Sequence, residues 1–265
     1  MKKRFLGYHT TAFISGNESI NGMKPFCFDN KSEYILDQVS FTNQRLGKLV
    51  EQFVCFQLQS DSKIKLLETN LQINDNKRTV GELDVLFTKG SEPIHLEIIY
   101  KFYIYDTLIK HSNPLSYWIG PNRKDNLVYK LDKLKNKQLP LLNNHLTQPY
   151  LEKHKLKEEQ IKQCIFFKAQ LFLPYNSQKI NVKPLNKDCI AGFYISFNDI
   201  LIFEDYYFYV PKKLDWLITP HNNVEWLDYK LATVKLENYI KSKQSPLVWI
   251  KDKTNNLKKC FITWW

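Results

Sequence analysis

The sequence predicts an α/β fold in which a mixed sheet is flanked by helices. Residues 80–103 contain two apolar, β-branched arms around a turn, as in a β-hairpin. Residues 42–58 and 124–138 carry apolar side chains at helical spacing, and the second of these segments precedes a buried-strand pattern at 164–173. The expected order is helix, three strands, helix, strand, which is typical of α/β folds.

The first helix is expected from about Thr42 to Leu58. Its apolar side chains recur every three or four positions and form one face: Leu46, Leu49, Val50, Phe53 and Val54. Glu51 lies beside this face rather than opposite it. Two interpretations of Glu51 stay open, a solvent-facing acid at the edge of the stripe or a residue directed into a functional site.

The hairpin brings two acids together. A strand is expected from Lys63 to Ile73, and two more follow on either side of the turn at residues 89–93. If the turn centres between Gly90 and Ser91, partner numbers sum to 181 and Asp84 lies opposite Glu97. Such partners have Cβ atoms about 5 Å apart on one face. A shift of one residue would place the two acids on opposite faces, and this alternative stays open.

Two carboxylates at that distance repel each other unless a cation or a shared proton lies between them. Mg²⁺ or Mn²⁺ is the usual cation for oxygen ligands of this kind. Glu82 and His95 share the face of Asp84 and Glu97 by the alternation of strand side chains. The alternative for His95 is a packed, hydrogen-bonded strand residue.

The second helix is expected over residues 124–138, ended by Pro140, with Leu127, Leu131 and Leu134 buried. Lysines form a separate stripe on it, and Arg123 precedes it: the candidate nucleic-acid-binding residues are Arg123, Lys130, Lys133 and Lys137. The stripe is either a solvated face or a surface that contacts phosphates. Residues 153–159 suggest a surface helix or loop before the strand at 164–173.

Composition favours a polyanionic partner. The chain of 265 residues has a net charge of +11, and 43% hydrophobic residues suffice for a large core. No apolar run approaches the roughly 20 residues of a membrane span, and the N-terminus is a poor signal peptide, so we expect a cytoplasmic protein. The cysteines show no zinc or disulfide spacing and are expected as free thiols: Cys27, Cys55, Cys164, Cys189 and Cys260.

Several short motifs occur in a recognisable order. They are Arg45-Leu46-Gly47 with Glu51, Asn70-Leu71-Gln72, Gly81-Glu82-Leu83-Asp84, His95-Leu96-Glu97, Lys101-Phe102-Tyr103, Gly120-Pro121-Asn122 and Gln138-Leu139-Pro140-Leu141. This run resembles a bacterial family of unknown function assigned to the PD-(D/E)xK nuclease-like, or restriction-endonuclease-like, superfamily. The resemblance implies an αβββαβ core over residues 41–175. Residues 1–40 would pack on that core, and residues 176–265 would form an aromatic-rich extension of unknown role.

The resemblance also implies a site. Asp84, Glu97 and Glu51 would hold Mg²⁺ or Mn²⁺, with the backbone carbonyl of Ile98 as a further ligand. The superfamily pattern places a lysine two residues after the second acid, but position 99 here is isoleucine. Lys101 lies on the same face, roughly 13 Å along the strand from Glu97 at about 3.3 Å per residue. Lys101 is therefore the expected catalytic lysine if the strand bulges or bends to bring its ammonium near the two acids. If the strand does not bend, Lys130 on the following helix is expected to take that role.

Three functions follow as expectations. The first is a metal-dependent nuclease that hydrolyses phosphodiester bonds in DNA or RNA. The second is a catalytically inactive module of the same fold that binds nucleic acid or protein. The third is an interaction protein whose surface is the aromatic C-terminal half, although core packing also accounts for those aromatic residues.

Overall fold

The computed structural model describes residues 1–265 apart from 29–33, 35, 37–39, 43–44 and 178–179. The chain divides into two compact units. Unit 1 comprises Met1–Ile14, Lys101–Val128 and Ala169–Trp265; unit 2 comprises Ser15–Tyr100 and Tyr129–Lys168. Two long strands, β3 (Glu92–Tyr105) and β5 (Lys162–Pro174), have one part in each unit. These units cut across the three expected segments, which remain a prediction.

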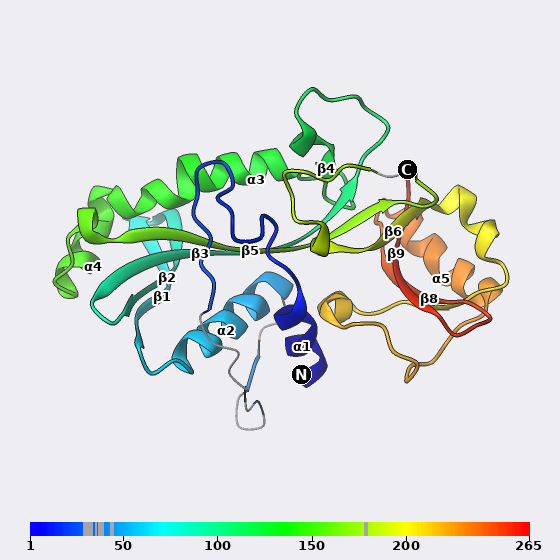
Figure 1. The fold of residues 1–265 in the computed structure, drawn as a ribbon, viewed down its shortest axis with the longest axis horizontal. Helices are drawn as coiled ribbons and strands as arrows, with labels where there is room; N and C mark the ends of the chain where they lie inside the picture. The colour runs from blue at the N-terminus through cyan, green and yellow to red at the C-terminus, as the bar shows by residue number, and fades with distance from the viewer. Residues whose placement is uncertain (29–33, 35, 37–39, 43–44, 178–179) are drawn as a thin grey trace. The chain divides into compact units, whose positions relative to one another are not determined.

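Unit 2 contains the expected run of helix, three strands, helix and strand. Its elements, besides β3 and β5, are α2 (Leu46–Gln59), β1 (Ile64–Asp75), β2 (Arg78–Lys89), most of α3 (Leu127–Lys133), the π-helical turn η2 (Leu134–Gln138), the 3₁₀ turns η3 (Leu139–Asn143), η4 (His145–Thr147) and η5 (Glu158–Gln160), and α4 (Gln148–Lys153). Figure 1 shows α2 and α3 on opposite sides of the strands in this part of the chain. Part of the expected segment 1–40 lies outside the described residues, but Phe26 N–H donates to Ile165 O of β5 at 2.9 Å.

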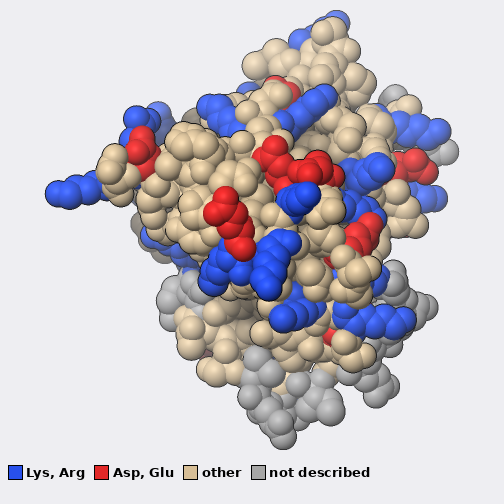
Figure 2. Space-filling model, turned by 90° about the vertical axis from the view of Figure 1, so that its left-hand side faces the viewer, with Lys and Arg blue, Asp and Glu red and all other residues tan. Residues whose placement is uncertain are grey.

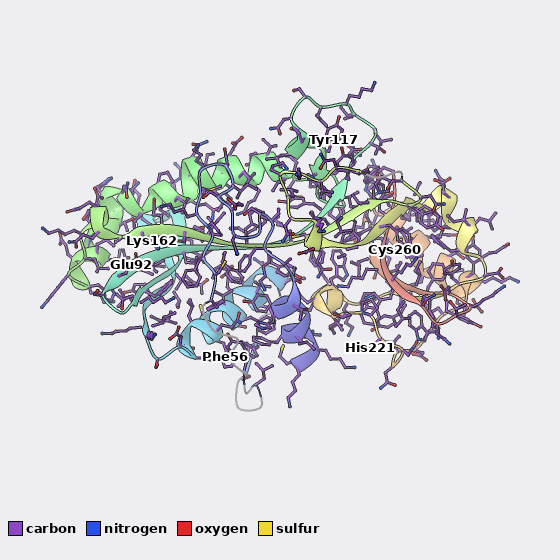
Figure 3. All side chains as sticks on the ribbon, in the orientation of Figure 1. Phe56, Glu92, Tyr117, Lys162, His221 and Cys260 are labelled. Atoms are coloured by element: carbon purple, nitrogen blue, oxygen red, sulfur yellow. The ribbon has the colours of Figure 1, made fainter. Side chains whose placement is uncertain are left out.

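The hairpin has the predicted register. Val85 pairs with Leu96 and Lys89 with Glu92, so partner numbers sum to 181. Gly90 has φ +60°, a conformation that glycine adopts at little cost and that tight hairpin turns require. At the turn end of the hairpin, Glu92 Oε1 and Lys162 Nζ lie 3.5 Å apart and connect the starts of β3 and β5 (Figure 3). The turn position therefore set the register, as the sequence indicated.

Both predicted helices bury the expected faces. The apolar residues predicted to form one face of α2 are at most 8% exposed, and Leu127, Leu131 and Leu134 are at most 2% exposed. The expectation that Pro140 ends the second helix is wrong. The chain continues as η3 with Pro140 in its first turn, where the missing N–H of proline has no helical partner to lose.

Unit 1 carries the remaining elements. They are α1 (Lys2–Thr10), β4 (Trp118–Ile119), β6 (Ile190–Ser196), β7 (Tyr207–Tyr209), α5 (Tyr229–Lys241), β8 (Leu247–Lys251), β9 (Leu257–Thr263) and the 3₁₀ turns η1 (Pro114–Tyr117), η6 (Lys187–Cys189), η7 (Phe197–Phe203) and η8 (Lys213–Leu217). Strand β6 is parallel to β5 and β9, whereas β8 is antiparallel to β9 and β7. Ala232 and Leu236 of α5 pack into a core with Val248 and Ile262.

The strand order is β1-β2-β3-β5-β6-β9-β8-β7, with β4 paired to β3. Parallel and antiparallel pairs occur in the same sheet, and helices flank it, so the predicted α/β class with a large mixed sheet is confirmed. All five cysteines are free. None of the helices in the described part of the chain has the length and apolar character needed to span a bilayer.

Candidate functional site

Asp84 on β2 is fixed by the main chain of β3. Among the described residues the β2–β3 ladder ends at Val85–Leu96, and the next residue of β2 is Asp84. Its Oδ2 accepts a hydrogen bond from the Ile98 backbone N–H at 2.8 Å. A hydrogen bond from the Asp84 backbone amide in turn lowers the pKa of Glu97. The Asp84 carboxylate is therefore fixed by the backbone of Ile98, and the Glu97 carboxylate contacts the backbone amide of Asp84.

Three acids gather in unit 2. One carboxylate oxygen each from Glu51, Glu82 and Asp84 lies within 4.8 Å of the other two. Glu82 and Asp84 are two positions apart on β2, so their side chains share a face, and Glu51 comes from α2. Of the two interpretations of Glu51, the structure shows the one in which it is directed into this cluster rather than into solvent.

Burial makes the ionised forms of Asp84 and Glu51 costly. It raises the pKa of Asp84 to about 7, with Glu97 as the next cause, although the Ile98 N–H opposes the shift. Burial likewise raises the pKa of Glu51 to about 7, with further contributions from Asp84 and Glu82 and an opposing hydrogen bond from Lys48. Carboxylates held together in this way attract a cation or retain a proton at neutral pH.

Lys48 supplies a cation to the cluster. Its Nζ donates to Glu51 Oε2 at 2.7 Å, to Asn70 Oδ1 at 2.8 Å and to Glu82 Oε1. Burial by itself lowers the pKa of Lys48, but the hydrogen bonds to Glu51 and Glu82 outweigh it, and the net shift is upward. Asn70 has φ +51°, which asparagine tolerates better than most residues. Two carboxylate oxygens and one amide oxygen thus surround Nζ and match the three N–H donors of the ammonium.

Lys48 is a site residue that was not predicted from the sequence. The lysine was expected on the strand of the second acid, whereas Lys48 precedes Glu51 by three residues on α2. Residues three apart on a helix are neighbours on its surface. That spacing was the one indication available from the sequence that Lys48 accompanies Glu51.

Glu97 is fully buried and receives hydrogen bonds on both oxygens. Gln138 Nε2 donates to Oε2 at 2.5 Å, and His95 Nε2 lies 3.1 Å from Oε1. Burial raises the pKa of Glu97 to about 7, while Lys130 and the Asp84 amide oppose that shift. Glu97 thus adjoins the group of Glu51, Glu82 and Asp84 but has partners of its own.

The protonation of His95 follows from its neighbours. Gln163 Nε2 lies 2.6 Å from the carbonyl oxygen of Leu139, which only accepts, so this atom is the amide nitrogen and donates. The same nitrogen lies 3.2 Å from His95 Nδ1, which therefore accepts. Burial lowers the pKa of His95 to about 4, so its Nε2–H donates to Glu97 from a neutral ring. His95 is therefore a buried hydrogen-bonded strand residue that orients Glu97.

The other predicted cations have different surroundings. Lys101 Nζ is paired with Asp125 Oδ2 at 2.6 Å, and Arg123 with Asp106 Oδ2 at 2.6 Å; all four residues belong to unit 1. Lys130 Nζ donates to Gln138 Oε1 at 2.8 Å, so it reaches Glu97 through that amide. Lys133 and Lys137 are exposed. The predicted role of the Ile98 carbonyl as a ligand stays a prediction, because the contact at Ile98 uses its N–H.

The residues present fit a hard divalent cation. Glu51, Glu82 and Asp84 offer convergent carboxylate oxygens, the ligand type that Mg²⁺ and Mn²⁺ prefer. A cation bound there would offset the burial and the carboxylate repulsion that raise the pKa of Asp84 and Glu51. Lys48 would then have to share the carboxylate oxygens with the metal or turn toward another anion.

Comparison with known proteins gives a family without an assigned activity. A family model described as "Domain of unknown function (DUF1853)" matches residues 28–260, which include every residue of the acidic cluster. No curated protein shows a significant match to the chain, and no solved structure does either. The chain belongs to the DUF1853 family.

Proposed function

We propose that this protein is a divalent-metal-dependent nuclease that hydrolyses phosphodiester bonds in DNA or RNA. The observation that carries the proposal is the convergence of the Glu51, Glu82 and Asp84 carboxylates, two of which, Glu51 and Glu82, pair with the Lys48 ammonium. Buried carboxylates with a lysine beside them are the groups that metal-assisted phosphodiester hydrolysis uses. The proposal also includes a restriction-endonuclease-like core over residues 41–175, which rests on the sequence motifs and on the element order of unit 2.

Each residue has a role in this proposal. Glu51, Glu82 and Asp84 would hold Mg²⁺ or Mn²⁺, with Glu97 beside them. When bound, the metal would lower the pKa of a water and stabilise charge on the phosphate. Lys48 would bind a non-bridging phosphate oxygen and neutralise the negative charge that develops there. His95 and Gln138 would hold the Glu97 carboxylate in one orientation.

The nucleic acid would be held by exposed lysines. Lys133 and Lys137 extend from the helical segment of α3 and η2 that supplies Gln138 to Glu97. Figure 2 shows Lys and Arg side chains spread over one face of the molecule with Asp and Glu side chains between them. Phosphate contacts on such a surface are electrostatic and independent of sequence.

A second function has one observation in its favour. The Lys48 ammonium already neutralises Glu51 and Glu82, so the cluster has a cation without any metal. A nuclease-derived module that binds nucleic acid or protein without cleaving it would be stable with this internal pair. Incubating the purified protein with single- and double-stranded DNA and RNA, in Mg²⁺, Mn²⁺ or EDTA, separates the two. Metal-dependent cleavage supports the nuclease, and binding without cleavage in either metal supports the module.

A further inference from the structure

A cavity of about 390 Å³ is lined by residues of unit 1, and none of its lining residues belongs to the acidic cluster. Its walls come from α1, β5, η6, β6, η8 and β9, and include Thr10, Gln170, Asp188 and Lys259. This volume is in the range of small-molecule sites. One wall is held by a close helix contact: a Cβ on Gly7 of α1 would come within 1.9 Å of Leu217 O, so only glycine fits there.

Lys259 is a buried cation in the wall of this cavity. Its residue is 6% exposed, and its Nζ donates to Gln170 Oε1 at 2.8 Å and to Trp216 O at 2.7 Å. Both acceptors are neutral, and an ammonium has three donors. Cys260, the next residue on β9, belongs to the hydrophobic core on the other side of the strand (Figure 3). One N–H of the Lys259 ammonium is thus left for a further acceptor.

The charged groups near Lys259 do not balance the positive charge of its ammonium. In the part of the chain that the structure describes, no carboxylate forms an ion pair with Lys259. Asp188 and Lys258, which also line the cavity, are exposed, and Asp215, adjacent to Trp216, is paired with Arg4 at 2.7 Å. Burial lowers the pKa of Lys259 to about 7. A buried charge without a partner is costly, and an anion beside it would offset that cost.

We propose that this cavity binds a small ligand that carries a carboxylate or a phosphate, whose anionic oxygen accepts the third N–H of Lys259. The hydrogen bonds from Nζ to Gln170 and Trp216 fix the ammonium in the cavity wall before the ligand arrives. The apolar parts of the wall would cover the remainder of the ligand. The proposal is independent of the nuclease proposal, because none of its residues belongs to the acidic cluster.

Calorimetric titration of the full chain with sulfate and with acetate, at constant ionic strength set by chloride, tests this. These probes keep their charge between pH 6 and pH 9, so changes with pH come from the protein. We expect wild type and Lys235→Met, which removes an exposed lysine of α5 outside the cavity wall, to bind at least one probe. Lys259→Met should bind that probe at least about tenfold more weakly. Equal binding by Lys259→Met, or binding of neither probe by wild type, would overturn the proposal.

A pH series on the wild-type protein decides the question if Lys259→Met does not fold. Only the ammonium form has a third N–H to donate, so affinity should fall about tenfold per pH unit above the free-state pKa and level off below it. An affinity that does not change between pH 6 and pH 9 would exclude Lys259 as the binding group.

Discussion

Lys48 Nζ lies 2.7 Å from Glu51 Oε2, three residues further along α2, and the same ammonium donates to Glu82 on β2. The ion pairs of Lys48 therefore connect helix α2 to strand β2. The expected nuclease pattern has a lysine where this chain has Ile99, and the lysine that contacts these acids in the structure is Lys48 of the helix.

Metal affinity should depend on the three clustered acids. Glu51→Gln, Glu82→Gln and Asp84→Asn each remove one ligand charge, and we expect Mn²⁺ affinity to fall by more than the roughly 10- to 100-fold typical of losing an outer-shell partner. Isothermal titration calorimetry measures this. Glu159→Gln, an exposed acid, is the matched control and should bind Mn²⁺ as wild type does. Unchanged affinity in all three variants would remove the metal from this cluster.

The metal-free protein should lose stability as pH rises through the range in which Asp84, Glu51 and Glu97 lose their protons. In the folded state Asp84, Glu51 and Glu97 keep their protons up to about pH 7, whereas ordinary values are 3.8 for Asp and 4.5 for Glu. The folded state thus binds more protons between about pH 4 and pH 7, and the free energy of unfolding falls as pH rises through that window.

Asp84→Asn isolates this effect because an amide oxygen still accepts the Ile98 N–H but never ionises. We expect Asp84→Asn in EDTA to match wild type at pH 4 and to exceed it at pH 8, on the order of a few kcal/mol, since each pKa unit corresponds to about 1.4 kcal/mol. Denaturant unfolding at both pH values measures the difference. Asp132→Asn, on an exposed position of α3, should show no such gain. An Asp84→Asn protein less stable than wild type at pH 8 would contradict the assigned shift.

Lys48→Met should separate metal binding from cleavage. Removing the ammonium leaves the carboxylates free for a metal, so we expect Mn²⁺ affinity to be kept or increased. Cleavage should slow about 100-fold or more, the range for loss of one electrostatic stabiliser. Lys65→Met, an exposed lysine of β1, serves as the control. If Lys48→Met cleaves at the wild-type rate, the same assay on Lys130→Met and Lys101→Met identifies the lysine instead.

Nucleic-acid binding should depend on salt through Lys133 and Lys137. Each phosphate contact releases condensed counterions, so the Lys133→Gln/Lys137→Gln double variant should flatten the slope of log affinity against log salt by up to about 1.8 for duplex DNA. Fluorescence anisotropy at several salt concentrations measures the slope. Lys230→Gln/Lys235→Gln on α5 removes the same charge from unit 1 and should leave the slope unchanged. An unchanged slope in the Lys133→Gln/Lys137→Gln variant would mean that these lysines form a solvated face and do not contact phosphates.

The hairpin and the helix faces could be predicted because local patterns determine them. The turn at Gly90 and the alternation of apolar residues set the register that brings Asp84 beside Glu97, and helical spacing located the buried face of α2. Glu51 could be placed at the edge of that face, although spacing alone left its direction open.

The remaining parts of the site depend on contacts between distant segments. Gln138 of η2 orients Glu97, and Gln163 of β5 orients His95, because both elements lie beside β3 in the folded chain. No sequence pattern identifies a glutamine that has such a role. Lys101 was expected on the face of Glu97, but its ammonium has Asp125 as a partner, which strand geometry alone does not indicate. The division into two units passes through β3 and β5, whose sequences contain no turn residue or proline at the point of division.

The most direct test of the proposed nuclease is single-turnover cleavage in Mn²⁺ by wild type, Asp84→Asn and Asp132→Asn, on single- and double-stranded DNA and RNA. We predict that wild type and Asp132→Asn cleave at least one substrate, that EDTA abolishes the reaction, and that Asp84→Asn is at least about 100-fold slower. Intact substrates with bound wild-type protein, or full activity in Asp84→Asn, would contradict the assignment of metal-dependent hydrolysis to this cluster.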